Sequence, residues 1–340
     1  MIKSIVRRSL VKKGPTSLEI RGATGVAPNS KNVASHFYTI LLSKSGKGKA
    51  CVIRRLGGIG DVLMCTPALR QIKTDFPDIE LTFAIDMHST TGNVYYELVR
   101  NAPFIDKIVD ARYVKQADYD AVVDISSVCI RYEHSGLPVL NRVDIFARAC
   151  GIPNLVHKRC WYSIEESETK WAKKIFEPFR REGKKIVVLH TASMEGKRCW
   201  PAEKYIELVE QGLNDKLPVQ FIILDFNNVF DKWEQYSNCY NASRTSVRQM
   251  AALIGAADFF IGPDSGPMHL AGAIGVASIV TFGSIPPEAR INFYPTHESA
   301  RLDTLACIGC WYKPCPYNTR CMKELDSKIV YNKMRRRLNV

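Results

Sequence analysis

The sequence predicts an α/β protein of two domains, each with a parallel β-sheet, and three observations support this prediction. Over residues 49–165, short apolar runs alternate with helical patterns, as in parallel βαβ units. The same alternation restarts at residue 184 and continues to residue 325. A charged helical stretch, residues 166–183, separates the two halves and is expected to link them. Because ligands bind at the carboxyl ends of parallel strands, the sheets are expected to face a cleft between the domains.

The elements of the first half follow from hydrophobic periodicity. Apolar runs of strand length lie at residues 50–56, 79–85, 105–111 and 119–126. Between and after them, helical spacing of apolar residues predicts helices at 61–76, 90–101 and 140–151.

The second half repeats this order. Predicted strands lie at residues 185–191, 219–226, 258–262 and 277–283. Predicted helices lie at residues 201–213, 246–257 and 267–275. Two halves of similar size therefore flank the linker.

The 340-residue chain has a net charge of +13, and the excess lies at its two ends. Residues 1–50 contain ten Lys or Arg and one acidic residue, whereas residues 326–340 contain five and one. We expect a basic extension over residues 1–48 and a basic tail over residues 326–340. Both are either solvated or in contact with an anionic partner.

Within the extension, residues 1–13 place apolar side chains near helical spacing between cations, which is typical of an amphipathic helix on an anionic membrane. Residues 14–35 have the composition of a linker or extended arm. No apolar run has the ~20 residues that span a bilayer, and no cleavable signal peptide is expected. The sequence thus predicts a cytoplasmic protein that can lie peripherally at the inner face of the membrane.

A first motif, LGGIGDVL, places Gly57, Gly58 and Gly60 between a predicted strand and a predicted helix. Glycines there allow a tight turn and close approach of a ligand to the backbone. The spacing differs from the Gly-x-Gly-x-x-Gly pattern of dinucleotide sites, so a nicotinamide cofactor is not expected. Asp61 opens the helix, and its position alone favours a helix cap over a catalytic role.

A second motif, GPDSGPMHLAGAIG, begins where the strand at 258–262 ends. Asp264, Ser265 and Gly266 stand at the start of a helix, where a hydroxyl and free amides suit an anion. His269 lies one turn further on. The alternative is a capped helix, with Asp264 as the N-cap and His269 as a buried core residue.

A third motif, HTASMEGKRCWP, follows the strand at 185–191 and contains Thr191 and Ser193. Its adjacent cations, Lys197 and Arg198, are suited to clamp a diphosphate leaving group. The alternative is an ordinary basic loop anchored by Trp200.

In combination and order, these motifs resemble the lipopolysaccharide heptosyltransferases of glycosyltransferase family 9. The runs VIRRLGGIGDVLMCTPALRQIKTDFPDIELTF and SVRQMAALIGAADFFIGPDSGPMHLAGAIGVASIVTFG carry the resemblance, and KRCWP is similar to the family's Lys-x-Trp-Pro loop. The resemblance covers residues 50–325. It implies the GT-B fold, in which two Rossmann-like domains face a cleft. Residues 49–165 would bind the acceptor and residues 184–325 an ADP-activated heptose.

The resemblance also implies the chemistry, which is inverting transfer of a sugar to a lipopolysaccharide, lipid-linked or other surface glycan, without a required metal or cofactor. Asp61 matches the general base, and the three motif glycines form the acceptor loop. Lys197 or Arg198 neutralises the donor diphosphate, and Cys199 leaves open which of the two does so. The remaining positions expected at the donor are Thr191, Ser193, Asp264, Ser265, Gly266 and His269. DFNNVFDKW departs from the family's glycine-rich loop after the strand at 219–226.

Four cysteines lie close together in CIGCWYKPCPYNTRC, namely Cys307, Cys310, Cys315 and Cys321. Four thiols at this spacing are a candidate ligand set for structural zinc or iron. The alternative is a group of reduced thiols that pack the C-terminal segment. The scattered cysteines are expected to be reduced and mostly buried.

Two further functions are considered. A sugar-nucleotide 2-epimerase shares the fold, but pairing Asp61 with the Lys197–Arg198 loop favours transfer. A DNA-directed glycosyltransferase or nucleic-acid binder would use the basic ends, and its binding would depend steeply on salt. No basic groove interleaved with aromatic residues is evident, so nucleic acid ranks last as a partner.

Overall fold

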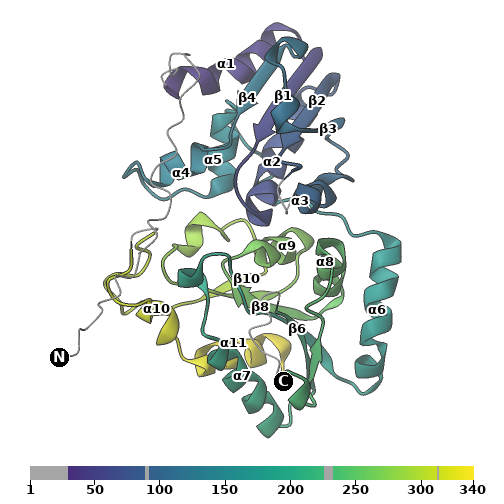
Figure 1. Ribbon diagram of the computed structural model, residues 1–340, viewed down its shortest axis with the longest axis vertical. Coiled ribbons are helices and arrows are strands. Elements are labelled where there is room, and N and C mark those ends of the chain that lie inside the picture. The colour runs from purple at the N-terminus through teal and green to yellow at the C-terminus, as the bar shows by residue number, and fades with distance from the viewer. Residues whose placement is uncertain (1–29, 89–91, 226–232, 312–313) are drawn as a thin grey trace, which may run out of the picture.

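The computed structural model describes residues 30–88, 92–225, 233–311 and 314–340, which form two α/β halves stacked end to end (Figure 1). The segment expected to form an amphipathic helix, residues 1–13, and most of DFNNVFDKW lie outside the described residues.

The amphipathic helix expected at residues 1–13 therefore stays a prediction.

The first half contains a four-stranded parallel sheet in the order β3-β2-β1-β4. Its strands are β1 (Gly48–Arg54), β2 (Ile79–Ile85), β3 (Lys107–Asp110) and β4 (Ala121–Asp124). The helices of this half are α1 (Ser30–Ser43), α2 (Ile59–Asp75), α3 (Gly92–Val99), α4 (Val128–Glu133) and α5 (Arg142–Ala149). Two 3₁₀ turns, η1 (Ala111–Tyr113) and η2 (Gln116–Asp118), connect β3 to β4.

The second half contains a six-stranded parallel sheet in the order β10-β9-β8-β5-β6-β7. Its strands are β5 (Lys185–His190), β6 (Val219–Leu224), β7 (Cys239–Asn241), β8 (Phe259–Pro263), β9 (Ser278–Thr281) and β10 (His297–Ala300). The helices are α7 (Ala202–Asn214), α8 (Val247–Ala256), α9 (Gly266–Ile274), α10 (Arg320–Lys323) and α11 (Ser327–Leu338). Three 3₁₀ turns complete it: η3 (Gly196–Arg198), η4 (Trp233–Gln235) and η5 (Pro287–Ala289).

The architecture confirms the predicted α/β class, with one parallel sheet in each half. Helix α6 (Glu166–Arg181) occupies the predicted linker and runs along one side of the molecule (right in Figure 1). It begins with a capping box, in which Glu168 accepts a hydrogen bond from the Glu165 amide at 2.8 Å. Ala172 and Phe176 are buried, so the linker is also part of the core.

Both chain ends differ from the expectation at the level of local structure. Helix α1 begins at Ser30, inside the segment expected to be an arm, and buries Phe37 and Leu41. The expected C-terminal tail is helix α11, which packs beside α7 and buries Val330, Tyr331 and Met334 (Figure 1). Several α11 cations are also paired within the fold: Lys333 and Arg336 contact Glu298. The tail is therefore structural, because apolar burial and ion pairs hold it.

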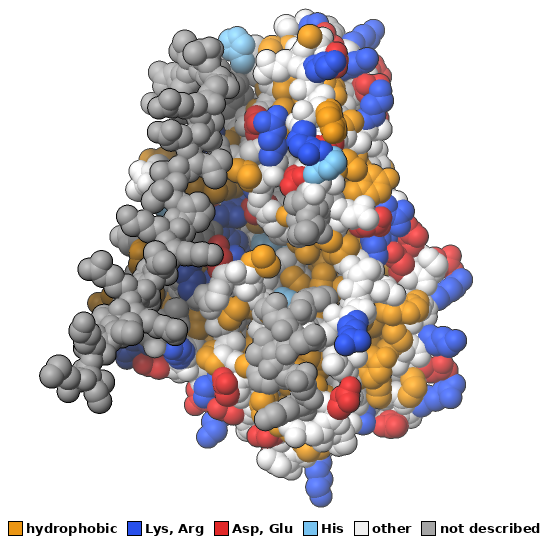
Figure 2. Space-filling view, viewed as in Figure 1, with side chains coloured by type: hydrophobic (Ala, Val, Ile, Leu, Met, Phe, Trp, Pro, Cys, Tyr) orange, Lys and Arg blue, Asp and Glu red, His pale blue; other side chains and the backbone are white. Residues whose placement is uncertain are grey.

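The two halves are joined through side chains as well as through α6. One apolar cluster runs from Leu63 and Leu69 of α2 to Met268 and Leu270 of α9 without interruption. On the face shown in Figure 2, basic and acidic side chains are interspersed over both halves. Among the described residues, no helix is both long enough and apolar enough to cross a membrane.

Candidate active site

The candidate site lies where the first turns of α2 and α9 meet between the halves. Each helix follows the carboxyl end of a strand, β1 or β8, as expected for parallel sheets. A Cβ atom added at Gly60 would lie 2.3 Å from Cδ2 of His269. A Cβ added at Gly266 would lie 2.7 Å from Cβ of Ile59. Glycine at both positions therefore allows the two helix starts to touch.

Asp61 lies at this contact with both carboxylate oxygens engaged. Its Oδ2 accepts a hydrogen bond from the Gly58 amide at 3.0 Å, which caps α2. Its Oδ1 lies 2.7 Å from Nη1 of Arg142 and 3.4 Å from Nη2 of Arg54. Burial raises the pKa of this carboxyl, but Arg142, Arg54 and the Gly58 amide outweigh burial and lower the pKa well below its usual range. The helix cap expected from position is present, and a pair of arginines is added to it.

A chain of buried ion pairs connects Asp61 to the second half. Arg142 also donates from Nε and Nη2 to the two oxygens of Glu133, both at 2.7 Å. Glu133 then meets Arg290 of the second half, at 3.1 Å. Arg290 lies 3.7 Å from Asp264, which Arg198 contacts at 3.2 Å. The arginines thus span the interface from the first motif to the second and third.

The second motif differs in detail from the expected capped helix. Ser265, not Asp264, is the N-cap of α9, and its hydroxyl donates to the Pro263 carbonyl at 3.2 Å instead of capping the helix. Asp264 is buried. Burial raises its pKa, but Arg290 and Arg198 outweigh this and lower it, so the carboxylate is ionised. The start of α9 therefore presents amides beside two arginines, an arrangement suited to an anion.

The third motif packs directly against the second. Ser193 donates its hydroxyl to the Asp264 carbonyl at 3.3 Å, and its amide donates to Sγ of Cys199 at 3.2 Å. Within the part of the chain that the structure describes, buried Oγ1 of Thr191 has no hydrogen-bond partner. Trp200 is buried and donates from Nε1 to the Leu325 carbonyl at 3.0 Å, so it is the anchor that the sequence suggested.

The two cations of this motif occupy different positions. Arg198 reaches Asp264, as described above, and also contacts Glu195 at 3.2 Å. The Nζ atom of Lys197 lies 3.8 Å from Glu195. Of the two, Arg198 is the one in contact with the residues at the start of α9.

His269 is buried between Gly60 and Tyr294. Its Nδ1 lies 3.0 Å from the Tyr294 hydroxyl, which donates to Sγ of Cys160 at 2.9 Å. Burial lowers the pKa of His269 to about 3, so the imidazole is neutral at physiological pH. The structure thus brings His269 to the predicted site, but as a neutral residue with a hydrogen-bond partner.

Four residues of the ion-pair chain were missed by the sequence motifs, Arg54, Glu133, Arg142 and Arg290, and so was the buried Asp225 after β6. Asp225 directly follows β6 and is buried, and its Oδ2 lies 3.5 Å from Nε1 of Trp233. Its Oδ1 has no hydrogen-bond partner within the described ranges. A polar residue directly after a strand is the signal that would have identified Asp225. The three arginines and Glu133 carry no such local signal.

The cysteine cluster does not form a metal centre among the described residues. There, no three His, Cys, Asp or Glu side chains are arranged to hold a metal ion. Sγ of Cys315 accepts a hydrogen bond from the Thr319 amide at 3.3 Å, and Cys321 is buried beside Gly283. Thiol chemistry suits zinc or iron, but the described cysteine side chains are not arranged as a ligand set for either metal.

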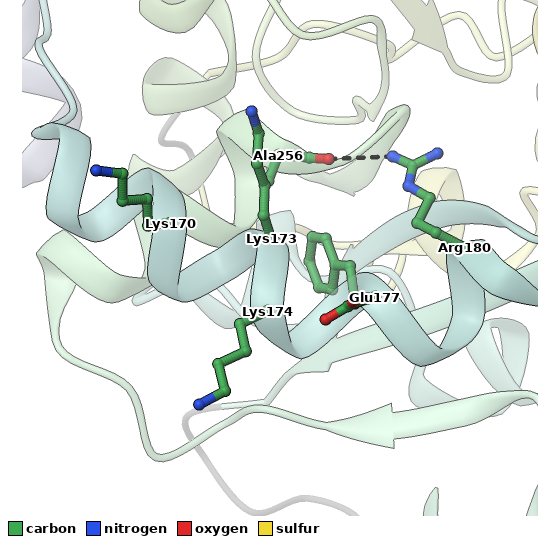
Figure 3. Close-up of a pocket in the computed structure, with 7 residues that line it drawn as sticks. Lys170, Lys173, Lys174, Glu177, Arg180 and Ala256 are labelled. Atoms are coloured by element: carbon green, nitrogen blue, oxygen red, sulfur yellow. Dashed lines mark hydrogen bonds between the residues drawn. The ribbon is translucent and has the colours of Figure 1, made fainter.

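A cavity of about 560 Å³ lies outside the site, along α6 (Figure 3). Its lining includes Lys170, Lys173, Lys174 and Glu177 of α6 and Ala256 of α8. The Ala256 carbonyl accepts a hydrogen bond from Arg180 at 3.1 Å. None of the lining residues belongs to the ion-pair chain, so this cavity is not the candidate active site.

Comparison with known proteins places the chain in one family of enzymes. The profile of glycosyltransferase family 9 (heptosyltransferase) matches residues 114–319. Lipopolysaccharide heptosyltransferase 1 of Campylobacter coli is 22% identical, over 74% of this chain and 88% of that protein. Lipooligosaccharide heptosyltransferase 2 of Campylobacter jejuni is 34% identical over 91 residues, which span 26% of this chain and only 28% of that relative.

Solved structures agree on the fold. ADP-heptose lps heptosyltransferase II of E. coli superposes with a TM-score of 0.62 at 15% identity, over 86% of this chain and 98% of that one. The iron-containing dodecameric glycosyltransferase TibC of enterotoxigenic E. coli gives 0.61 at 14% identity, over 86% and 79%. The expected GT-B fold is thereby confirmed.

Proposed function

The chain belongs to glycosyltransferase family 9, the heptosyltransferase family, and we propose that it transfers a heptose from ADP-heptose to a lipopolysaccharide or related surface glycan. The observation that supports this most strongly is the meeting of Asp61 with the ion pairs at the start of α9. The proposed base comes from the first half, and the arginines proposed to bind the diphosphate come from the second half. In this proposal the first half binds the acceptor and the second half binds the donor.

Asp61 is the proposed general base. An acceptor hydroxyl gives its proton to Asp61, and its oxygen forms a bond to the anomeric carbon of the donor sugar. The bond from that carbon to the diphosphate oxygen breaks, and its electron pair leaves with ADP. Attack opposite to the leaving group inverts the anomeric centre. The base and the leaving-group site therefore belong on opposite sides of the sugar, and the two halves supply them.

Neutralisation of the departing diphosphate is assigned to Arg198, with Lys197 beside it and the free amides at Ser265 and Gly266. Arg198 is favoured because it already reaches Asp264 at 3.2 Å, whereas Lys197 contacts Glu195. A guanidinium and helix amides can hold the charge that other transferases give to a divalent cation. Thr191 and Ser193 lie next to this site, and His269 positions the start of α9. Turnover that persists in excess EDTA is expected.

Action at the cytoplasmic face of the membrane is part of the proposal. Residues 1–13 supply cations and apolar side chains in an amphipathic pattern. Near the site, Leu56, Ile130 and Leu137 are more than half exposed, and they offer an apolar rim to the lipid part of an acceptor. Helix α11 is not proposed to contact the membrane, because three of its cations, Lys333, Arg335 and Arg336, pair with Glu298 or Asp215.

The test is ADP release from ADP-heptose, with heptose-deficient lipopolysaccharide as acceptor and mass spectrometry of the product. A panel of other nucleotide sugars serves as the donor control. Asp61→Asn is expected to retain donor binding and to lower turnover by about 10²–10⁴-fold. Undiminished turnover would remove Asp61 as the base. Transfer from a different nucleotide sugar alone would overturn the donor assignment.

A further inference from the structure

Among the described residues, six titratable groups lie around Asp61, and three of them, all arginines, are charged at neutral pH. They are Arg54 of β1, Cys65 of α2, Cys129 of α4, Arg142 of α5, His269 of α9 and Arg290 after η5. Burial raises the pKa of both thiols and lowers that of His269, so these three are neutral. The field at Asp61 is therefore set by arginines.

Two arginines contact Asp61, and they are held in different ways. Arg54 donates to the backbone carbonyls of Ile125 and Ser126, and its guanidinium lies 5.0 Å from the centre of the Phe146 ring. Those partners belong to the fixed frame of the first half. Arg142 makes the shorter contact with Asp61, at 2.7 Å, and it also holds the side chain of Glu133 through two hydrogen bonds. Arg142 thus makes the closer contact with Asp61 and links it to Glu133.

The contact between Arg142 and Asp61 opposes base catalysis. An Oδ1 atom that accepts a hydrogen bond from a guanidinium is less available to accept a proton. The nearby cation also stabilises the ionised carboxylate, which makes it a weaker base. The bidentate bond to Glu133 uses Nε and Nη2 and leaves Nη1 for Asp61. Loss of the Nη1 contact removes the shorter of the two arginine contacts with Oδ1, while the bidentate bond to Glu133 remains.

We propose that Arg142 is a positioning residue that gates Asp61: while Glu133 keeps its Nε and Nη2, Nη1 withdraws from Oδ1 and allows Asp61 to take the proton of an acceptor hydroxyl. The inference rests on the proposed function, because it assumes that Asp61 is the base. Glu133 also contacts Arg290 at 3.1 Å, and Arg290 lies next to Asp264. Glu133, which holds Arg142, is therefore tied to the donor half through Arg290.

The test compares full-length Arg142→Gln, Arg142→Lys and wild type. The readout is the pH dependence of kcat/KM for ADP release from ADP-heptose with heptose-deficient lipopolysaccharide. Arg142→Gln removes a cation from Asp61, so the acid limb of the profile is expected to move up by about 1–3 pH units. Arg142→Lys keeps the charge and is expected to keep the limb near its wild-type position, with lower kcat because lysine lacks the fork that holds Glu133.

Arg248→Gln is the matched control. Arg248 is also buried, and it makes a bidentate pair with Glu168 at 2.7 Å and contacts the first half at the Glu97 carbonyl. It has no part in the Asp61 cluster, so its loss is expected to lower stability and leave the acid limb in place. A merely structural role for Arg142 predicts that Arg142→Gln behaves like Arg248→Gln, and that result would overturn the gate.

A second measurement does not require turnover. In protein with ¹³C-labelled aspartate carboxyl groups, Asp61→Asn identifies the Asp61 signal by its absence, and its titration is compared between wild type and Arg142→Gln. A midpoint that moves to higher pH in Arg142→Gln supports control of the Asp61 carboxyl by Arg142, even if no nucleotide sugar is turned over and the proposed function is wrong. An unmoved midpoint overturns the gate even if transfer is observed.

Discussion

Gly60→Ala tests whether the contact of α2 with α9 sets the geometry of the site. The added Cβ would lie 2.3 Å from Cδ2, 2.9 Å from Nε2 and 3.2 Å from Cγ of His269. The ring cannot yield easily, because it is buried and hydrogen-bonded to Tyr294 at 3.0 Å. An ordinary carbon–carbon contact needs about 3.5–4.0 Å, so the two helix starts must separate by more than ~1 Å. Overpacking of this kind costs about 1–3 kcal/mol, and alanine's helix propensity returns less than ~1 kcal/mol of it.

The assays are the thermal unfolding midpoint and kcat for ADP release. A net loss of about 1–2 kcal/mol lowers the midpoint by roughly 2–8 °C, and a shift of ~1 Å between base and donor lowers kcat by up to about 10²-fold. Gly58→Ala is the stability control, because a Cβ there meets no atom within 4 Å. In the double variant Gly60→Ala/His269→Ala, the space left by the ring admits the methyl group, so the double variant is expected to cost less than the sum of the two single variants. Strict additivity, or wild-type stability of Gly60→Ala, would refute the reasoning.

Two further predictions concern stability. Burial lowers the pKa of His190 and His297 to about 4 and that of His269 to about 3. Because the unfolded chain binds these protons near pH 6.5 and the folded protein does not, stability is complete above that pH and falls on acidification, by at most about 1.4 kcal/mol per pH unit for each histidine. An unfolding midpoint that is flat between pH 7 and pH 5 would contradict this. Deletion of residues 326–340 is expected to destabilise the second half, because it exposes the core beneath α11, whereas Lys328→Ala on the exposed face is neutral. A deleted protein that unfolds at the wild-type midpoint would mean that α11 contributes nothing.

Hydrophobic periodicity was sufficient for the interior strands and insufficient at the margins of the molecule. All eight predicted strands are present, because strands buried on both faces are runs of apolar residues. Strands β7 and β10 were missed because Cys239–Asn241 and His297–Ala300 are short, polar edges of the sheet. Helix α11 was missed because its many cations obscure the three apolar residues that it buries.

The candidate site shows the same division between local and tertiary signals. Glycines at strand–helix turns and the serine at the start of α9 are local features, and the sequence identified them. Arg142 lies 81 residues from Asp61, and Arg290 lies 157 residues from Glu133. An arginine in a helix has no distinctive pattern, and only the packing of α5 against α2 shows that Arg142 contacts Asp61.

The helix-cap and general-base interpretations of Asp61 are compatible, because they use different oxygens. Oδ2 accepts a hydrogen bond from the Gly58 amide and fixes the start of α2, whereas Oδ1 accepts a hydrogen bond from Arg142. The cap holds the carboxylate in one orientation, and that orientation is what a base requires. Asparagine at this position keeps an oxygen for the Gly58 amide but cannot take a proton, so Asp61→Asn separates the two roles. A folded Asp61→Asn protein without turnover would show that the cap survives and that the base is lost.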